Sequence, residues 1–352
     1  MINLTDYGFS DYFEHEINNP DYIAARITAV HKERYEIICE YGLSHARLKS
    51  AVYYNNSAEP FPTTGDFVLI QYNASGDNLI TKTLPRKTFF SRRDPTPGRG
   101  EQAVAANFDY VFIMQSLNHD FNEKRLERYI TLAWQSESIP VIVLTKADLA
   151  DDFSEQLREA ERIAPGIAII AVSARSEFGL DRLADYLKPG KTIVFLGSSG
   201  VGKSSLINTL AGGDIMAVNE IREDDSRGRH TTTHRQLITL PSGVMIIDTP
   251  GMRELGMWDV SVGLGEAFTD VEEYLEKCRF SDCRHESEPG CAIREALESG
   301  ALSEERWQSY NRLKKEAKYS GNQRAALLEK WQRNKEISKH NKQMKKNGGY
   351  KR

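Results

Sequence analysis

One short stretch, LGSSGVGKSSLIN at residues 196–208, decides the fold of this chain. It has the spacing of a phosphate-binding loop, it follows the apolar segment TIVF, and it leads into a segment with helical character. In such a loop the backbone N–H groups surround phosphate groups at the start of a helix. We therefore predict a nucleotide-binding α/β domain with the phosphate loop Gly197, Ser198, Ser199, Gly200, Val201, Gly202, Lys203, Ser204 and Ser205.

Two of these side chains have separate predicted roles. Lys203 would reach the β- and γ-phosphates and assist catalysis, and the Ser204 hydroxyl would bind Mg²⁺. A second apolar segment, GVMIID, ends at Asp248 and continues as Thr-Pro-Gly. Asp248 could hold the same Mg²⁺, and the N–H group of Gly251 could sense the γ-phosphate. Alone, DTPG could be an ordinary turn; with the phosphate loop upstream it indicates the second half of a nucleoside triphosphate switch.

The base is expected to be read by two other segments. Thr145-Lys146-Ala147-Asp148 follows an apolar segment and resembles the guanine-reading Asn-Lys-x-Asp of GTPases. Its Asp can accept the ring N–H and the exocyclic amine of guanine, a pair that adenine does not offer. Thr145 stands where Asn is usual, and we expect this change to weaken one supporting contact. Ser173 and Ala174 match the accessory Ser-Ala motif, although either segment alone could be a plain βα loop.

The order of these motifs is unusual. Strand-like and helix-like segments alternate over 103–258, which indicates a parallel α/β sheet, and ligands bind at the strand ends of such sheets. Ordinary GTPases run from phosphate loop to switch to base-reading motifs. Here the base-reading motifs come first, the phosphate loop second and DTPG last. The sequence therefore predicts a circularly permuted P-loop GTPase domain.

The remaining sequence predicts two flanking domains. Residues 1–90 contain short alternating segments separated by Gly, Asn and Pro, which favour an OB-like β barrel; a sandwich or an SH3-like barrel stays open. The stretch FSRRDPTPGRGEQAV after it has no periodicity and is interpreted as a linker or mobile loop. After Trp258 the chain becomes polar and helical. We predict three domains, at 1–90, 91–258 and 259–352.

Three of the four cysteines gather in the last domain. The pattern Cys278-x4-Cys283-x-His285-x5-Cys291 offers three thiolates and an imidazole, which would satisfy a tetrahedral, structural Zn²⁺ with no open position. The spacing is not that of a common zinc finger, so a disulfide or unliganded core cysteines stay open as alternatives. Cys39 stands alone in an apolar stretch and is predicted to be a core residue.

Charge is distributed unevenly. The chain has a net charge of −4, yet residues 306–352 contain 15 Lys or Arg and 3 Asp or Glu. This basic tail contains Tyr and Trp and suggests an arm that binds RNA; a solvated helix with a frayed end is the alternative. The apolar runs are too short to span a bilayer, and the acidic start does not have the pattern of a signal peptide. We expect a cytoplasmic protein that does not bind membranes.

Together these segments resemble the RsgA (YjeQ) family of circularly permuted GTPases over nearly the whole chain. The most specific matches are GSSGVGKSSLIN, GRHTTTH, DTPGMRELG and CRFSDCRHESEPGCAIREA. The resemblance implies GTP hydrolysis to GDP during late maturation of the small ribosomal subunit, stimulated by that subunit. It also implies that the barrel and the zinc domain contact ribosomal RNA. We expect the protein to act as a monomer. The four proposed zinc ligands match the family's ligand for ligand.

The switch region bears on mechanism. Met252 follows DTPG where Ras-like enzymes carry a water-orienting Gln, so the attacking water must be positioned differently. The segment RGRHTTT, residues 227–233, occupies the position of the first switch, where Thr232 would bind Mg²⁺ and sense the γ-phosphate. His230 is the candidate to orient the water, and the resemblance supports that role. The alternative is a surface histidine in a flexible loop.

Two other functions remain to be weighed. A metabolic P-loop kinase or ATPase is disfavoured by the TKAD and Ser-Ala motifs and by the lack of an evident acceptor-substrate domain. An RNA-binding regulatory module with weak or no turnover is disfavoured because Lys203, Ser204 and Asp248 are all present. A nucleotide competition assay separates the kinase from the GTPase. Turnover measured with and without small subunits distinguishes the RNA-binding module from the GTPase.

Overall fold

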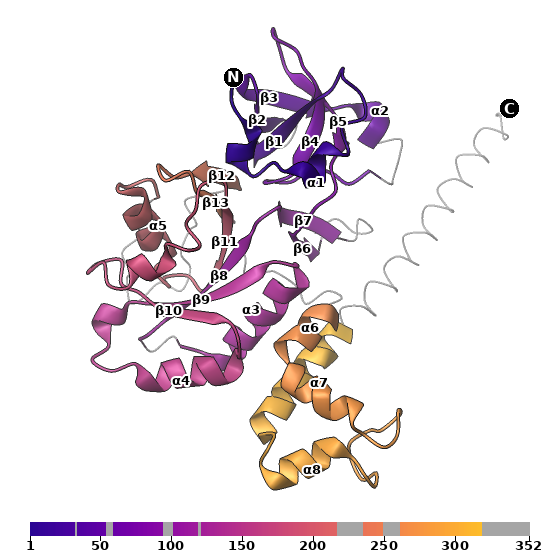
Figure 1. Ribbon diagram of the computed structural model, residues 1–352, viewed down its shortest axis with the longest axis vertical. Coiled ribbons are helices and arrows are strands. Elements are labelled where there is room, and N and C mark those ends of the chain that lie inside the picture. Colours follow the sequence, from indigo (N-terminus) through magenta and orange to yellow (C-terminus); the bar gives the residue numbers. More distant parts are fainter. Residues whose placement is uncertain are drawn as a thin grey trace, which may run out of the picture. The chain divides into compact units, whose positions relative to one another are not determined.

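The computed structural model describes residues 1–31, 34–53, 59–93, 101–118, 121–216, 235–248 and 261–318. The chain divides into two compact units (Figure 1). The first joins Met1–Phe90 with Ala103–Glu254, and the second joins Ser91–Gln102 with Leu255–Arg352. Among the described residues, every helix is too short or too polar to cross a membrane.

The first unit begins with a closed five-stranded barrel. The strands follow the order β1-β2-β3-β5-β4, and β4 pairs back with β1 to close the ring. Among the described strands of the barrel, β3 and β5 pair in parallel and the other neighbours pair antiparallel. Alternate side chains such as Ile27, Ile37 and Ile80 fill the interior. The predicted OB-like barrel is confirmed, with strands β1 (Ile23–Val30), β2 (Tyr35–Cys39), β3 (Gly42–Leu48), β4 (Phe67–Gln71) and β5 (Asn78–Thr83).

Short helical turns accompany the barrel. They are η1 (Leu4–Tyr7), α1 (Asp11–Glu14) and α2 (Ser50–Tyr53). Phe13 of α1 is buried and packs on Phe67, with ring centroids 4.4 Å apart. Cys39 is fully buried in the barrel core, as the sequence predicts.

The second part of this unit is a six-stranded α/β sheet. Its order is β10-β9-β8-β11-β13-β12, parallel except for β12. The strands are β8 (Tyr110–Ser116), β9 (Ile139–Thr145), β10 (Ala168–Ala171), β11 (Thr192–Gly197), β12 (Gln236–Thr239) and β13 (Met245–Asp248). The helical segments are α3 (Glu123–Gln135), η2 (Ala147–Leu149), α4 (Ser154–Ile163), η3 (Leu180–Leu183) and α5 (Lys203–Ala211). Leu206 of α5 belongs to the same buried apolar cluster as Phe112 and Phe195, and α3 contacts β8 and β9.

The strand order makes the permutation visible. β11, which leads into the phosphate loop, lies between β8 and β13. On one side lie β8, β9 and β10, which precede it in the chain, and on the other lie β13 and β12, which follow it. The predicted circular permutation is therefore confirmed by topology.

Three local expectations differ from the structure. Part of the predicted linker forms β6 (Phe89–Arg93) and β7 (Glu101–Ala106), which pair with each other. The short strand β12 was not foreseen, because its four residues are half exposed and their apolar pattern is weak. The segment GLDRLADYL at 179–187, one of the helix-like segments of the sequence, forms only the short 3-10 turn η3.

A pairing of β1 with β12 joins the barrel to the α/β sheet. Ala29 of β1 lies opposite Gln236 of β12, and Gln236 in turn lies opposite Asp248 of β13. The two parts therefore share one continuous sheet of 11 strands.

The second unit is mostly helical, as predicted. It contains α6 (Ser261–Ala267), α7 (Thr269–Glu276), α8 (Ala292–Ser299) and a helical stretch over 304–318. Phe268 is fully buried, and the buried Arg306 guanidinium lies 4.0 Å from its ring centroid. Arg306 also pairs with Asp270 at 2.8 Å, which ties the last helical stretch to α7. The tail from residue 319 onward lies outside the described residues.

Candidate nucleotide site and metal cluster

The phosphate loop connects the end of β11 to the start of α5. Gly200 and Gly202 have φ angles of 74° and 101°, a left-handed conformation that favours glycine. At Gly197 a Cβ atom would lie 3.0 Å from Val201 Cγ1 and 3.1 Å from Met114 Cβ. The glycine pattern therefore reflects both backbone conformation and tight packing.

Lys203 and Asp248 meet where β11 and β13 end. Lys203 Nζ lies 2.6 Å from Asp248 Oδ1, and the Asp248 side chain is 3% exposed. Asp248 is the last residue of β13, and β13 pairs directly with β11. Lys203 thus offers a cation for phosphate groups, and the carboxylate beside it could bind a divalent cation. Ser204, the second residue of α5, follows Lys203 directly.

Thr145 links the end of β9 to the phosphate loop. Its hydroxyl donates to the Val201 carbonyl oxygen at 2.6 Å and lies 3.3 Å from the Gln115 carbonyl oxygen. The side chain is nearly buried, so solvent does not compete for the hydroxyl. The residue that departs from the usual Asn thus has a direct contact with the loop, 56 residues later in the chain.

Asp148 and Ser173 come together from neighbouring strands. The Ser173 hydroxyl donates to Asp148 Oδ1 at 2.6 Å and accepts from the backbone N–H groups of Arg175 and Ser176. Ser173 is fully buried, whereas Asp148 is exposed. Lys146 has a φ angle of 60°, a strained conformation for a residue other than glycine, at the point where the chain turns into η2. Ser173 therefore orients a carboxylate that solvent can reach.

The same edge of the sheet carries all these groups. Thr145, Gly197 and Asp248 end β9, β11 and β13, and Ser173 follows β10 closely. Thr209 of α5 donates to the Ala174 carbonyl oxygen at 3.3 Å, which ties the Ser-Ala segment to the helix after the phosphate loop. Carboxyl ends of parallel strands are where ligands bind in such sheets. The predicted residues Thr232, His230, Gly251 and Met252 lie outside the described residues.

The predicted cysteine and histidine ligands gather in the second unit. One ligand atom from each of Cys278, Cys283, His285 and Cys291 lies within 4.8 Å of the others. His285 Nδ1 is 3.6 Å from Cys278 Sγ and 3.5 Å from Cys291 Sγ, so Nδ1 faces the thiols. All four cysteines of the chain are free of disulfides. The cluster could hold a metal ion.

A glutamate that sequence reasoning missed shapes the loop between the ligands. Glu288 accepts hydrogen bonds from the backbone N–H groups of Arg284, Glu286 and Ser287 at 3.0–3.1 Å. A bond from the backbone N–H of Glu288 itself and these three bonds stabilise the carboxylate and lower the pKa of Glu288 to about 2. The loop carries His285, whose φ angle is 63°. The signal was present as the acidic residue in the turn SEPG.

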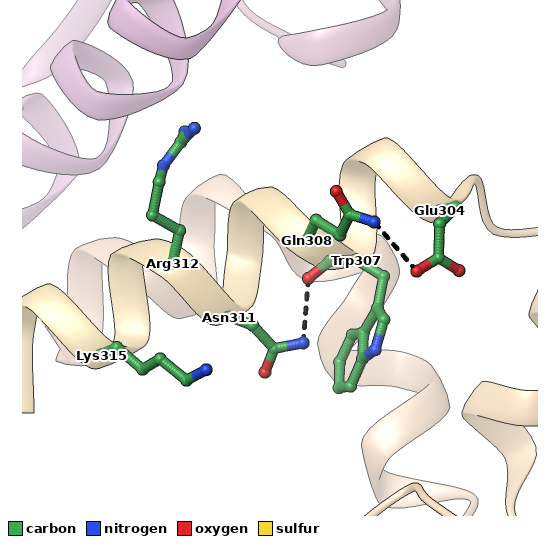
Figure 2. A pocket seen from close by; sticks show the side chains of 6 residues that line it. All are labelled: Glu304, Trp307, Gln308, Asn311, Arg312 and Lys315. Carbon is green, nitrogen blue, oxygen red and sulfur yellow. Dashed lines mark hydrogen bonds between the residues drawn. The ribbon is translucent and has the colours of Figure 1, made fainter.

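A groove lies along the helical stretch beside this cluster. Figure 2 shows its lining, which includes the indole of Trp307 and the amine of Lys315. The Trp307 ring meets the His285 ring edge-on at 5.5 Å and stacks on Tyr310 at 5.7 Å. The imidazole that faces the thiols thus also supports the tryptophan of the groove. The full lining is Glu304, Trp307, Gln308, Asn311, Arg312 and Lys315.

Comparison with known proteins identifies the family. Residues 83–258 match the family described as RsgA GTPase. The small ribosomal subunit biogenesis GTPase RsgA 1 of Listeria innocua is 47% identical over 330 residues, covering 94% of each chain. The RsgA of Methanosarcina acetivorans is 41% identical over 299 residues, covering 85% of this chain and 80% of its own.

Two solved structures share the architecture. The crystal structure of YjeQ from Thermotoga maritima superposes with a TM-score of 0.63 at 26% identity, covering 83% of this chain and 97% of that one. YloQ, described as a circularly permuted GTPase, superposes with a TM-score of 0.61 at 25% identity and covers 86% of this chain and 96% of its own. With its topology, its strand-end residues and these matches taken together, the chain belongs to the RsgA GTPase family.

Proposed function

We propose that this protein binds GTP at the carboxyl ends of strands β9, β11 and β13 and hydrolyses it to GDP and phosphate. We propose further that it acts on the small ribosomal subunit during late maturation. The observation that carries the proposal is the contact between the Thr145 hydroxyl and the Val201 carbonyl oxygen. It joins the candidate base-reading segment to the phosphate loop, although the two are far apart in the permuted chain. A single ligand with a guanine base and a phosphate chain fits both segments.

In this proposal each described residue has a defined task. Lys203 exchanges its contact with Asp248 for the β- and γ-phosphates, and the loop N–H groups from Gly197 to Ser205 bind the phosphate oxygens. Asp248 and Ser204 hold Mg²⁺, which neutralises phosphate charge. Asp148 accepts from the two guanine N–H donors while Ser173 and Ala174 orient it. Lys146 and Thr145 support the base and the loop.

The hydrolytic step requires residues of the switch segments. We assign Thr232 to Mg²⁺ and γ-phosphate contact, Gly251 to a γ-phosphate contact and His230 to orientation of the attacking water. Their positions in the sequence, between the phosphate loop and DTPG or within it, and the family resemblance support these roles. A His230→Ala variant should bind GTP with unchanged affinity while its subunit-stimulated turnover falls. Unchanged turnover would remove His230 from the mechanism.

The metal cluster is proposed to bind one structural Zn²⁺. A tetrahedral zinc with bonds of about 2.3 Å to sulfur and about 2.0 Å to nitrogen places the two kinds of ligand atom roughly 3.6 Å apart. The measured distances from His285 Nδ1 to Cys278 Sγ and Cys291 Sγ are 3.6 and 3.5 Å. Burial and the neighbouring thiols raise the pKa of Cys283 to about 11, which favours the neutral thiol there. A divalent cation would reverse this by stabilising the thiolates.

The proposed ribosomal partner is supported by the names of the relatives and by the positive charge of the tail. The matching proteins of both Listeria innocua and Methanosarcina acetivorans are named small ribosomal subunit biogenesis GTPases. We propose that this chain binds the same subunit as a monomer in the cytoplasm. Ribosomal RNA would be contacted by the barrel, by the zinc-binding unit and by the basic tail. The excess of Lys and Arg over 306–352 supports an RNA contact that depends on salt.

Turnover with and without purified small subunits tests the proposal. We expect slow GTP hydrolysis alone, strong stimulation by subunits, and competition by GTP and GDP but not by ATP. A Lys203→Ala variant should lose turnover in both conditions, which excludes a contaminating hydrolase. Equal use of ATP would favour a P-loop kinase or ATPase. Subunit binding with no turnover at all would favour the RNA-binding module.

The tail has a separate test. Deletion of residues 335–352 removes much of the basic charge but none of the nucleotide site. We expect weaker subunit binding with a smaller dependence on salt, and unchanged GTP binding. Unchanged subunit affinity at low and moderate salt would exclude the tail from the interface.

A further inference from the structure

The turn Thr63–Asp66 of the barrel is buried although all its side chains are polar or absent. Thr64 and Asp66 are fully buried, and Gly65 lies between them. The Asp66 carboxylate accepts from the Thr63 backbone N–H at 2.7 Å and from the Arg86 guanidinium at 2.8 and 2.7 Å. Such charge-assisted bonds in a buried place hold the turn in one conformation.

This rigid turn contacts the α/β sheet rather than solvent. The Thr64 hydroxyl donates to the carbonyl oxygen of Arg235 at 3.3 Å, and Arg235 is the residue before β12. The Thr64 carbonyl oxygen accepts from the Ala106 backbone N–H at 3.0 Å. The Gly65 carbonyl oxygen accepts from Asn107 Nδ2 at 3.3 Å. The turn is thus fastened both to the strand leading into the α/β sheet and to the start of β12.

Gly65 approaches the strand that bears the metal-binding carboxylate. A Cβ atom at Gly65 would lie 2.1 Å from the Ala106 carbonyl oxygen and 2.8 Å from Ile247 Cδ1. Ile247 is the residue before Asp248. No side chain fits there without a backbone shift, and the φ angle of 93° independently favours glycine.

Strand pairing connects the barrel to the strand that carries Asp248. Ala29, Gln236 and Asp248 lie opposite one another on β1, β12 and β13. Arg26, also on β1, is fully buried and its Nη1 lies 3.2 Å from Sδ of Met245 on β13. Residues of the barrel therefore lie close to both ends of β13 and to the start of β12.

We propose that the Thr63–Asp66 turn is a positioning element of the nucleotide site. Thr64 fixes where β12 begins, Gly65 allows β13 to approach, and together they set the place of the Asp248 carboxylate relative to Lys203. The barrel and the GTPase chemistry are coupled through this contact. Because such coupling is reciprocal, occupation of the nucleotide site changes the turn in return. This inference rests on the proposed Mg²⁺–GTP site.

Two variants and one matched control test the inference. Gly65→Ala forces the backbone at Ala106 or β13 to shift, whereas Thr64→Val removes only the hydroxyl that donates to Arg235. Gly42→Ala is the control, because Gly42 also has a positive φ angle, 115°, but a Cβ there meets nothing within 4 Å. All three proteins are compared with wild type in melting temperature, in GTP affinity, and in the Mg²⁺ concentration that half-saturates turnover.

The Mg²⁺ dependence is the readout that a merely structural role would not change. We expect Gly65→Ala to raise the half-saturating Mg²⁺ on the order of tenfold, because small misplacements of a functional group cost up to about a hundredfold. Thr64→Val should raise it about two- to fivefold, as expected for one lost hydrogen bond. Gly42→Ala should keep the wild-type value even where its melting temperature falls. A Gly65→Ala protein too unstable to assay leaves the decision to Thr64→Val.

Two results would overturn the inference. The first is wild-type Mg²⁺ dependence and turnover in the folded turn variants. The second is an equal shift in Gly42→Ala, which would show that general loss of stability is responsible. If wild type itself neither binds GTP nor needs Mg²⁺, the proposed function has failed instead, so the two failures are distinguishable. Amide exchange at Gly65 and Ala106 with and without a GTP analogue gives the reciprocal measurement, and equal exchange rates would also count against the coupling.

Discussion

Replacing Thr145 by valine removes one hydroxyl and almost no volume. The hydroxyl has a single hydrogen, and the short contact of 2.6 Å to the Val201 carbonyl oxygen uses it. A buried carbonyl oxygen left without its donor costs about 1–3 kcal/mol. We expect the phosphate loop of the free variant to shift so that water reaches this oxygen, whereas a bound phosphate chain would hold the loop in place. The cost therefore falls mainly on the bound state, and GTP affinity should drop roughly five- to 150-fold.

Titration with a fluorescent GTP analogue measures this loss directly. Thr145→Ser is the matched control, because it keeps the hydroxyl and loses only a methyl group, so its affinity should stay within about fourfold of wild type. The melting temperature of the nucleotide-free Thr145→Val protein should change little, and the increase on adding GTP should shrink. Wild-type affinity in Thr145→Val, or an equal loss in Thr145→Ser, would show that the contact with Val201 does not support nucleotide binding.

Three further changes have defined outcomes. Asp148→Asn places an amide donor opposite the N–H donors of guanine, so GTP affinity should fall on the order of a thousandfold. Xanthosine triphosphate, which offers an acceptor there, should bind the variant better than GTP. A retained preference for GTP would show that Asp148 does not recognise the base. Cys283→Ser should lose the zinc and lower the melting temperature of the second unit, and zinc analysis showing one ion per chain would refute the ligand assignment. Glu288→Gln should destabilise the same unit at pH 7. Because the pKa of Glu288 is lowered to about 2, its stabilisation is present above its unfolded pKa of about 4.3 and is lost toward pH 2. The difference from wild type should therefore shrink across that range at matched zinc content. A constant difference would show that the charge of Glu288 does not stabilise the loop through these backbone hydrogen bonds.

Long apolar segments made most of the fold predictable. Segments such as Tyr110–Ser116 and Ile139–Thr145 are buried along nearly their whole length, as expected for strands covered on both faces. The order of the motifs then predicted the permutation. β12 escaped prediction because its burial comes from pairing with β1 and β13, not from its own pattern. The paired strands β6 and β7 escaped prediction because their residues are mostly polar or small.

The candidate site was predictable as residue identities but not as contacts. Lys203, Asp248, Asp148 and Ser173 could be named from spacing alone, and the structure brings them together in two pairs. The bond from Thr145 to the phosphate loop could not be foreseen, because nothing in a local motif says which distant backbone atom a hydroxyl will reach. The turn at Thr63–Asp66 has the composition of an ordinary surface turn. The turn is buried only because the barrel and the α/β sheet pack together in the first unit, and no local sequence pattern reports that packing.

The permutation also determines where the chain enters and leaves the α/β sheet. The barrel is attached at the amino end of β8, and the second unit follows from the carboxyl end of β13. β8 and β13 lie on either side of β11 and run parallel to it. The strand that ends in the phosphate loop is therefore flanked by the strand at which the chain enters the sheet and by the strand after which it leaves the sheet.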